Sequence, residues 1–175
     1  MHTARLTIRR VQPDDLGDLL EVNGDDTVTR FLPYPTWKSA TDAQLWFERM
    51  AALQAAGATA QFVIEHRELA RVIGSCLLFR HDPASGRAEI GYVLGRAHWG
   101  QGLMHEAMRG FIVHAFGTLG LRRLEADVNP LNQASVRLLE RLGFRREGLL
   151  RQRWVTKGEV SDSLLFGLLR DEAQP

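Results

Sequence analysis

Two glycines, Gly100 and Gly102, stand in the segment HWGQG, between an apolar run and a long segment whose apolar residues recur at helical spacing. Glycines let a ligand approach the backbone without interference from side chains. The start of a helix offers unpaired N–H groups and the positive end of the helix dipole, which together bind a pyrophosphate. A plain strand-to-helix turn would show the same pattern, so the function of this loop depends on the residues around it.

Glu89 is the carboxylate best placed to act as a base near this loop. In the strand expected over residues 88–94, alternation places Glu89 on the same face as Gly91 and Val93. Desolvation among apolar neighbours raises the proton affinity of a carboxylate, as a general base requires. An ion pair with an arginine at the edge of the core is the alternative role for Glu89.

The remaining histidines and the cysteine show no pattern that indicates chemistry. His98, His105 and His114 have no carboxylate partner at a fixed spacing, so we expect surface or packing roles for them. Cys76 is the only cysteine and lies in the apolar run VIGSCLLF, which is typical of a buried thiol. No cysteine cluster could hold zinc, so we predict that the protein has no metal site.

Hydrophobic periodicity and turn residues divide the chain into the elements that must position these groups. Strands are expected at 5–11, 61–65, 72–79, 88–94, 124–128, 149–155 and 160–169, and helices at 13–22, 41–56, 103–119 and 132–142. The strand–helix–strand unit over 88–128 requires a parallel crossover. The sequence therefore predicts an α/β (α+β) domain with a mostly antiparallel sheet of about seven strands and about four helices.

Composition indicates an ordinary soluble domain. The chain has 175 residues, 45% hydrophobic and 25% charged, so residues 1–175 are expected to form one domain. A net charge of +1 argues against nucleic acid as a partner. No apolar run approaches the ~20 residues of a membrane helix, and the N-terminus lacks the apolar segment of a signal peptide. A cytoplasmic protein with no membrane contact is therefore expected.

Charge is distributed unevenly along the chain. Residues 14–26 carry six acids and no base, and residues 137–157 carry seven bases against two acids. The acids could attract a cationic amine and some of the bases could contact nucleotide phosphates. Solvated faces of helices and strands are the alternative interpretation.

Several segments together resemble one enzyme superfamily. AEIGYVL, HWGQGLMHEAM and NPLNQASVRLLERLGF occur in the order and spacing of the GNAT acetyltransferases, and nearly the whole chain is similar to the RimJ/RimL-like branch. That branch acetylates the N-termini of ribosomal proteins. The resemblance implies a GNAT-like sheet with two splayed parallel central strands, acetyl-CoA as cosubstrate and transfer of an acetyl group to a primary amine.

The resemblance also implies a binding site for acetyl-CoA. The pantetheine arm and its pyrophosphate would be bound by residues from the strand end, the glycine loop and the start of the second motif helix, namely Tyr92, Val93, Leu94, Trp99, Gly100, Gln101, Gly102, Leu103, Met104, Asn129 and Asn132. Asn132 is equally well placed to be the N-cap of the helix that follows it. Met104 departs from the Gly or Ala usual at its position.

The catalytic acid is the second departure from the family pattern. Many relatives protonate the leaving thiolate with a tyrosine, but this chain has Leu139 at that position. In RimL-like members a serine has been proposed for the role, and Ser135 matches it. Ser135 also lies in the first turn of a helix, where serine is often only a capping residue.

The resemblance implies that the acceptor is the α-amine of a protein or peptide N-terminus. The FLPYPTW loop, with Phe31, Tyr34 and Trp37, would line the pocket that binds this acceptor. A small-molecule amine such as an aminoglycoside, a polyamine or an amino acid is the alternative acceptor. A CoA-binding module without turnover is the alternative from another class. A homodimer is expected from the family analogy.

Overall fold

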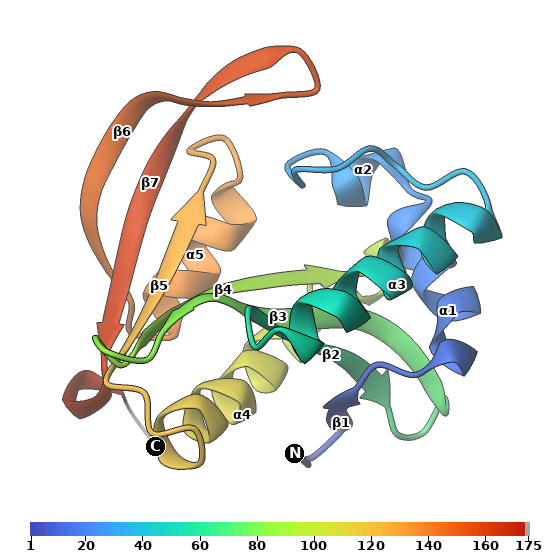
Figure 1. Cartoon of the computed structure of the whole chain (residues 1–175), viewed down its shortest axis with the longest axis horizontal. Coiled ribbons are helices and arrows are strands. Elements are labelled where there is room, and N and C mark those ends of the chain that lie inside the picture. Colours follow the sequence, from blue (N-terminus) through green and yellow to red (C-terminus); the bar gives the residue numbers. More distant parts are fainter. Residues whose placement is uncertain (174–175) are drawn as a thin grey trace.

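The computed structural model describes residues 1–173 and contains one seven-stranded sheet in the order β1-β2-β3-β4-β5-β7-β6 (Figure 1). The strands are β1 Leu6–Arg10, β2 Thr59–His66, β3 Arg71–Asp82, β4 Arg87–Leu94, β5 Arg123–Val128, β6 Arg145–Thr156 and β7 Glu159–Leu169. All neighbouring strands are antiparallel except β4 and β5. The predicted mixed, mostly antiparallel sheet is therefore confirmed.

Four of the five α-helices were predicted and one was not. The helices are α1 Leu16–Asn23, α2 Asp26–Thr29, α3 Ala40–Ala55, α4 Leu103–Gly117 and α5 Gln133–Arg141. The unpredicted helix is α2, which has four residues and is too short to show a periodic pattern. Its N-cap is Asp25, whose carboxylate accepts a hydrogen bond from the N–H of Thr27 at 2.7 Å. No helix in the described part of the chain is long and apolar enough to cross a membrane.

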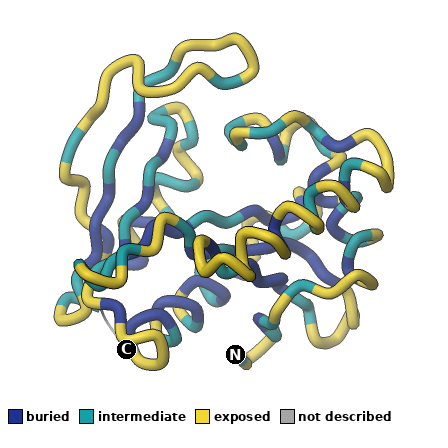
Figure 2. Tube along the Cα trace, in the orientation of Figure 1, coloured by how far each residue is buried: buried dark blue, intermediate teal, exposed yellow. Residues whose placement is uncertain are grey.

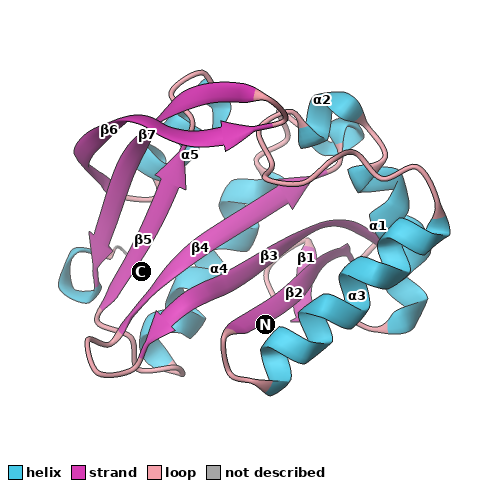
Figure 3. Cartoon of the chain, turned by 45° about the horizontal axis from the view of Figure 1, so that its top comes forward, coloured by secondary structure: helices cyan, strands magenta, loops and turns pink. Residues whose placement is uncertain are grey.

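The two faces of the sheet are covered by different helices (Figure 3). Phe62 and Ile64 of β2 belong to the main core, to which α4 and α5 contribute, whereas Val63 points the other way into a smaller core with α1 and α3. This division follows from strand alternation, since successive side chains leave a strand on opposite faces. The buried segments in Figure 2 follow the central strands and the inner faces of these helices.

The parallel pair of strands opens soon after it forms. Only three residue pairs join β4 to β5, namely Arg87 with Arg123, Ala88 with Leu124 and Glu89 with Glu125. Beyond these pairs β4 and β5 diverge, as Figures 1 and 3 show. Within the part of the chain that the structure describes, the β5-facing edge of β4 therefore has no partner strand from residue 90 to residue 94, and the predicted splay is present.

A long hairpin of β6 and β7 extends beyond the end of β5 (Figure 1). Its two-residue turn consists of Lys157 and Gly158, which both have positive φ (54° and 82°), as in a type I′ turn. The ammonium of Lys157 donates a hydrogen bond to the carbonyl oxygen of Thr29 at 2.7 Å. The tip of the hairpin is thereby joined to the C-terminal end of α2.

Candidate active site

The glycine loop presents open backbone at the N-terminus of α4. Gly100 and Gly102 have φ of 74° and 75°, a conformation that side-chain-bearing residues rarely adopt. A Cβ atom at Gly100 would meet no atom within 4 Å, and one at Gly102 would meet only the Arg5 guanidinium, at 3.8 Å. The first three N–H groups of α4 have no acceptor within residues 1–173. This loop fits an anionic ligand such as a pyrophosphate.

Arg5 and Glu106 hold this loop against the first strand. The guanidinium of Arg5 donates to the Glu106 carboxylate at 2.7 Å and to the carbonyl oxygen of Gln101 at 3.1 Å. Glu106 also accepts hydrogen bonds from the N–H of Arg5 and from the Thr3 hydroxyl. Burial raises the pKa of Glu106, but these hydrogen bonds outweigh it and leave the pKa below its usual value. Sequence patterns could not reveal the role of Arg5, because 101 residues separate it from Glu106.

Trp99 and Met104, two large residues beside the glycines, each have a contact that holds the side chain in place. The indole N–H of Trp99 donates to the carbonyl oxygen of Leu94 at 2.7 Å, which ties the loop to the end of β4. The side chain of Met104 packs against the main core. The carbonyl of Leu94 therefore already has a partner, whereas at Tyr92 the β5-facing edge of β4 lies beyond its last pair with β5.

The start of α5 brings two hydroxyl groups together. The side-chain oxygen of Asn132 accepts from the N–H of Ser135 at 3.2 Å, so Asn132 is the N-cap of the helix. The hydroxyl oxygens of Tyr92 and Ser135 lie 2.6 Å apart, within hydrogen-bonding distance. Burial raises the pKa of Tyr92 to about 12, against a smaller opposing effect of this hydrogen bond. Leu139 is fully buried in the main core.

Asn129 stands at the turn before α5. Its side-chain oxygen accepts from the N–H of Leu131 at 2.9 Å, and its carbonyl oxygen accepts from the N–H of Asn132 at 2.9 Å. Both contacts shape the turn between β5 and α5. Contact of Asn129 or Asn132 with the pantetheine arm stays a prediction.

Glu89 lies where β4 and β5 part, and it is 9% exposed. One carboxylate oxygen accepts from the Arg80 guanidinium at 2.8 Å, and the other is buried without a partner among residues 1–173. Arg80 has a φ of 49° and lies in a register shift between Phe79 and Asp82. Such a bulge re-aims a side chain, so sequence alternation could not predict this partner.

A second carboxylate, Asp127 of β5, lies near Arg80. The indole N–H of Trp154 is 3.2 Å from both Asp127 oxygens, and the Ser163 hydroxyl donates to one of them. The Arg80 guanidinium lies 5.8 Å from the Trp154 ring, within cation–π range. The pKa of Arg80 is raised chiefly by its hydrogen bond with Glu89, with a contribution from Asp127. The sequence pattern did not single out Arg80, Asp127 or Trp154.

The three aromatic residues predicted to line the acceptor pocket differ in their surroundings. Trp37 is 6% exposed and packs in the smaller core, with its ring 5.4 Å from that of Trp46. The Tyr34 hydroxyl donates to the Asn23 side chain at 2.9 Å. Phe31 is half-buried beneath the guanidinium of Arg30, at 5.0 Å. Packing therefore accounts for much of the surface of Trp37, and the acceptor role of all three stays a prediction.

Ion pairs neutralise part of the acidic N-terminal region. Arg9 pairs with Asp15 at 2.8 Å and Arg71 with Asp18 at 2.5 Å. Asp26, on α2, forms a longer ion pair, with the Lys38 ammonium at 3.7 Å. Exposed acidic side chains therefore remain both before α1, at Asp14, and on α2, at Asp26.

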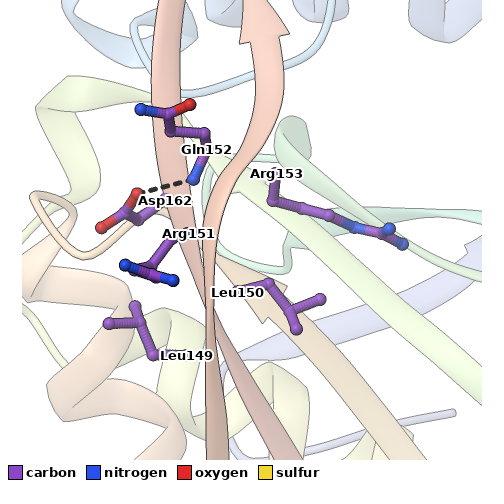
Figure 4. A pocket seen from close by; sticks show the side chains of 6 residues that line it. All are labelled: Leu149, Leu150, Arg151, Gln152, Arg153 and Asp162. Carbon is purple, nitrogen blue, oxygen red and sulfur yellow. Dashed lines mark hydrogen bonds between the residues drawn. The ribbon is translucent and has the colours of Figure 1, made fainter.

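An open pocket of about 880 Å³ lies on the β6–β7 hairpin (Figure 4). Its lining residues are Leu149, Leu150, Arg151, Gln152, Arg153 and Asp162. The N–H of Gln152 donates to Asp162 at 2.8 Å, within a register shift of β6. Neither the glycine loop nor the Glu89 carboxylate lines this pocket. In the described part of the chain, no group of three His, Cys, Asp or Glu side chains could hold a metal ion.

A sheet that opens at its one parallel pair, with free helix N–H groups beside the opening, is the architecture of a GNAT acetyltransferase. The family model described as an acetyltransferase (GNAT) domain matches residues 5–145. The chain belongs to this family and is an N-acetyltransferase.

Relatives of known name agree with this assignment. An uncharacterized N-acetyltransferase of Bacillus licheniformis, p20, is 37% identical over 172 residues, which cover 98% of this chain and 97% of that protein. The ribosomal protein uS5-alanine N-acetyltransferase of Escherichia coli is 34% identical over 86 residues, 49% of this chain and 44% of that protein. The structure of spermidine N-acetyltransferase from Vibrio cholerae, solved with CoA and spermine, superposes with a TM-score of 0.85 at 21% identity. The superposition covers 97% of this chain and 98% of that protein.

Proposed function

We propose that this enzyme transfers an acetyl group from acetyl-CoA to the α-amine of a protein or peptide N-terminus. The observation that carries the proposal is the buried oxygen of Glu89 that has no partner within the described residues, at the point where β4 and β5 part. A buried carboxylate oxygen without a donor is costly, so a ligand or water that donates to it is favoured. An acceptor amine, or a water between the two, meets that requirement.

The glycine loop and the splay fit acetyl-CoA. The free N–H groups at the start of α4 would bind the pyrophosphate, and the unpaired edge of β4 along Tyr92 and Val93 would bind the pantetheine arm. Acetyl-CoA supplies the acetyl group as an activated thioester. The remaining requirements are a base for the amine, a donor for the carbonyl oxygen and an acid for the sulfur.

Glu89 would remove the proton from the amine through a water molecule. The ion pair with Arg80 fixes one carboxylate oxygen and leaves the other toward the site. An α-amine has an unperturbed pKa of ~7.7–8.0, against ~10.4 for lysine. A single carboxylate is a modest base, and a modest base is enough for an α-amine near neutral pH.

The charge beside Glu89 also favours an α-amine over a polyamine. The Arg80 guanidinium would repel a second positive charge on the acceptor, and a peptide carries none beside its N-terminal amine. The E. coli relative is named for an alanine N-terminus, which agrees with this choice. The second candidate acceptor is a polyamine, which the exposed Asp26 of α2 and the V. cholerae structure support.

The test is a comparison of thiol release with a matched panel of amines. The panel contains an alanine- or serine-starting peptide, the same peptide with a blocked N-terminus and one internal lysine, spermidine and an aminoglycoside. We expect kcat/KM to be highest for the free α-amine peptide, by about tenfold or more over the blocked peptide, following the pKa difference between the amines. A higher kcat/KM for spermidine or the internal lysine would overturn the acceptor assignment and leave acetyl transfer intact.

A further inference from the structure

The structure places a tyrosine hydroxyl beside Ser135 although Leu139 occupies the family's tyrosine position. Tyr92 comes from β4 and Ser135 from the first turn of α5, and their oxygens lie 2.6 Å apart at the open end of the splay. We propose that Tyr92 relays a proton through Ser135 to the departing sulfur of CoA. This inference rests on the proposed function, because it concerns the second half of the same reaction.

The two hydroxyls lie on the opposite face of β4 from the base. Tyr92 follows Glu89 by three residues, and strand alternation sends the two side chains to opposite faces. Glu89 contacts Arg80 on one face, whereas Tyr92 packs against the main core on the face covered by α4 and α5. Proton removal from the amine and proton delivery to the sulfur are therefore separated by the strand that would bind the pantetheine arm.

The environment keeps the Tyr92 hydroxyl protonated. Burial raises the pKa of Tyr92 to about 12, so the phenol is uncharged throughout the neutral pH range. A serine hydroxyl alone is a weak acid, because the alkoxide that it leaves behind is unstable. A phenol that donates to the same oxygen stabilises that developing charge, as preorganised donors do in other active sites. Ser135 is half-buried and can face the site while it contacts Tyr92.

The proton balance of the step is closed. The acceptor nitrogen first forms a bond to the thioester carbon. As the carbon–sulfur bond then breaks, the sulfur keeps the electron pair and receives the proton of Ser135, and Ser135 receives the proton of Tyr92. The proton that the acceptor nitrogen loses leaves through Glu89 and water, and water returns one proton to Tyr92. Tyr92 is a positioning residue in this scheme because it acts through Ser135.

A structural role for the same contact makes a different prediction. Buried hydroxyls are usually hydrogen-bonded, so the pair could serve only to satisfy Tyr92 and Ser135. In that case removal of the Tyr92 hydroxyl would affect stability or cosubstrate affinity and would do so whether or not Ser135 is present. A double-mutant cycle separates the two roles.

The experiment measures kcat by thiol release for the wild type, Tyr92→Phe, Ser135→Ala and the double variant. We expect Tyr92→Phe to lower kcat about tenfold to hundredfold in the Ser135 background, within the range of positioned acid catalysis. In the Ser135→Ala background the same substitution should change kcat by less than about twofold, since the relay is already broken. The KM for acetyl-CoA and the thermal shift that acetyl-CoA produces should stay within about twofold of wild type in every variant.

Ser135→Thr is the conservative control, because it retains a hydroxyl at the same position. It should keep most of the rate and should keep the dependence on Tyr92. An equal loss of kcat in both backgrounds, or a Tyr92→Phe enzyme within about twofold of wild type, overturns the relay. Both outcomes are read with any amine that the wild type accepts, so a different acceptor preference would refute the proposed function without affecting this test.

Discussion

At the scale of single residues, two glutamates of the parallel strands differ in how many of their carboxylate oxygens are paired with arginine. Glu89 and Glu125 are paired in register across the parallel strands. Glu125 accepts from Arg87 and Arg123 at 2.7 Å each, so both of its oxygens are used within the fold. Glu89 has Arg80 on one oxygen only. The two glutamates therefore form a natural comparison between a candidate base and a structural carboxylate.

Glu89→Gln should lower the rate most at low pH and least at high pH. At low pH most of the acceptor α-amine is protonated and needs a base, whereas above its pKa of ~7.7–8.0 the amine is already free. The measurement is a pH–rate profile of kcat/KM from about pH 6 to pH 9 on an alanine- or serine-starting peptide, where a loss of roughly 10²-fold is expected at the acid end.

Glu125→Gln is the matched control for that profile. It removes a carboxylate at the paired position without touching the unpartnered oxygen of Glu89, so any change in rate should be the same at every pH. A loss that is uniform over pH for Glu89→Gln as well would show that Glu89 has a structural role only.

At the scale of elements, the glycine loop and α4 would act as one anion-binding unit. The positive φ of Gly100 and Gly102 turns the chain from β4 into the helix with its first N–H groups exposed. Arg5 and Glu106 fix that unit to β1 through hydrogen bonds of 2.7–2.8 Å. The loop is therefore rigid before a ligand arrives, which reduces the entropic cost of binding.

Gly102→Val should abolish the increase in melting temperature that acetyl-CoA produces. A β-branched side chain at this position would occupy the space from which a pyrophosphate approaches the N–H groups of α4. The melting temperature of the protein alone should also fall, because valine is strained at a φ of 75°.

Gly120→Val separates that strain from the loss of binding. Gly120 has a φ of 71° and open space around its Cα, and it lies after α4, away from the glycine loop. It should show a similar drop in melting temperature and a normal shift with acetyl-CoA. If Gly102→Val folds and binds acetyl-CoA with unchanged affinity, the assignment of the loop is wrong.

At the scale of the whole molecule, two segments that are far apart in the sequence border the open splay and contact each other. The β6–β7 hairpin lies on one side and α2 on the other, and Lys157 joins them through the carbonyl oxygen of Thr29 (Figure 1). The tip of the hairpin and the start of α2 are exposed (Figure 2), whereas the base of β7 contributes Leu164, Phe166 and Leu168 to the main core. Elements with few buried contacts move apart at low free-energy cost. The hydrogen bond from Lys157 to Thr29 limits such a movement between the hairpin tip and α2.

Lys157→Met should raise the KM for the peptide acceptor a few-fold and leave the affinity for acetyl-CoA within about twofold. The substitution removes the ammonium and keeps an unbranched side chain, so it breaks the link between the hairpin and α2 without touching the glycine loop. The loss of one hydrogen bond from a charged donor corresponds to about 1.5–3 kcal/mol at most, part of which water replaces.

Arg153→Met is the control, since Arg153 lies on the same hairpin and stacks on Trp154, but its contacts do not reach α2. If Lys157→Met changes the KM for the peptide and the KM for acetyl-CoA by the same factor, a role at the acceptor side is contradicted.

Light scattering on the same samples will also test the expected homodimer, which stays a prediction from family analogy.

Local sequence patterns were enough to predict most of the elements and the position of the glycine loop. Those features are local: a strand or helix follows from the period of its apolar residues, and the glycine loop is one contiguous segment. The element order was confirmed, and the boundaries moved by a few residues, as where β6 begins at Arg145 rather than at residue 149. Helix α2 was missed because one turn contains no period.

Which side chains face each other within the site depends on tertiary packing, which local patterns do not predict. Tyr92 and Ser135 are 43 residues apart, and their contact depends on how α5 lies across the splay. The partner of Glu89 depends on a bulge in β3, and the brace of the glycine loop joins residues 101 positions apart. Periodicity determines the face on which a residue lies, but strand register, bulges and helix packing determine what it meets on that face.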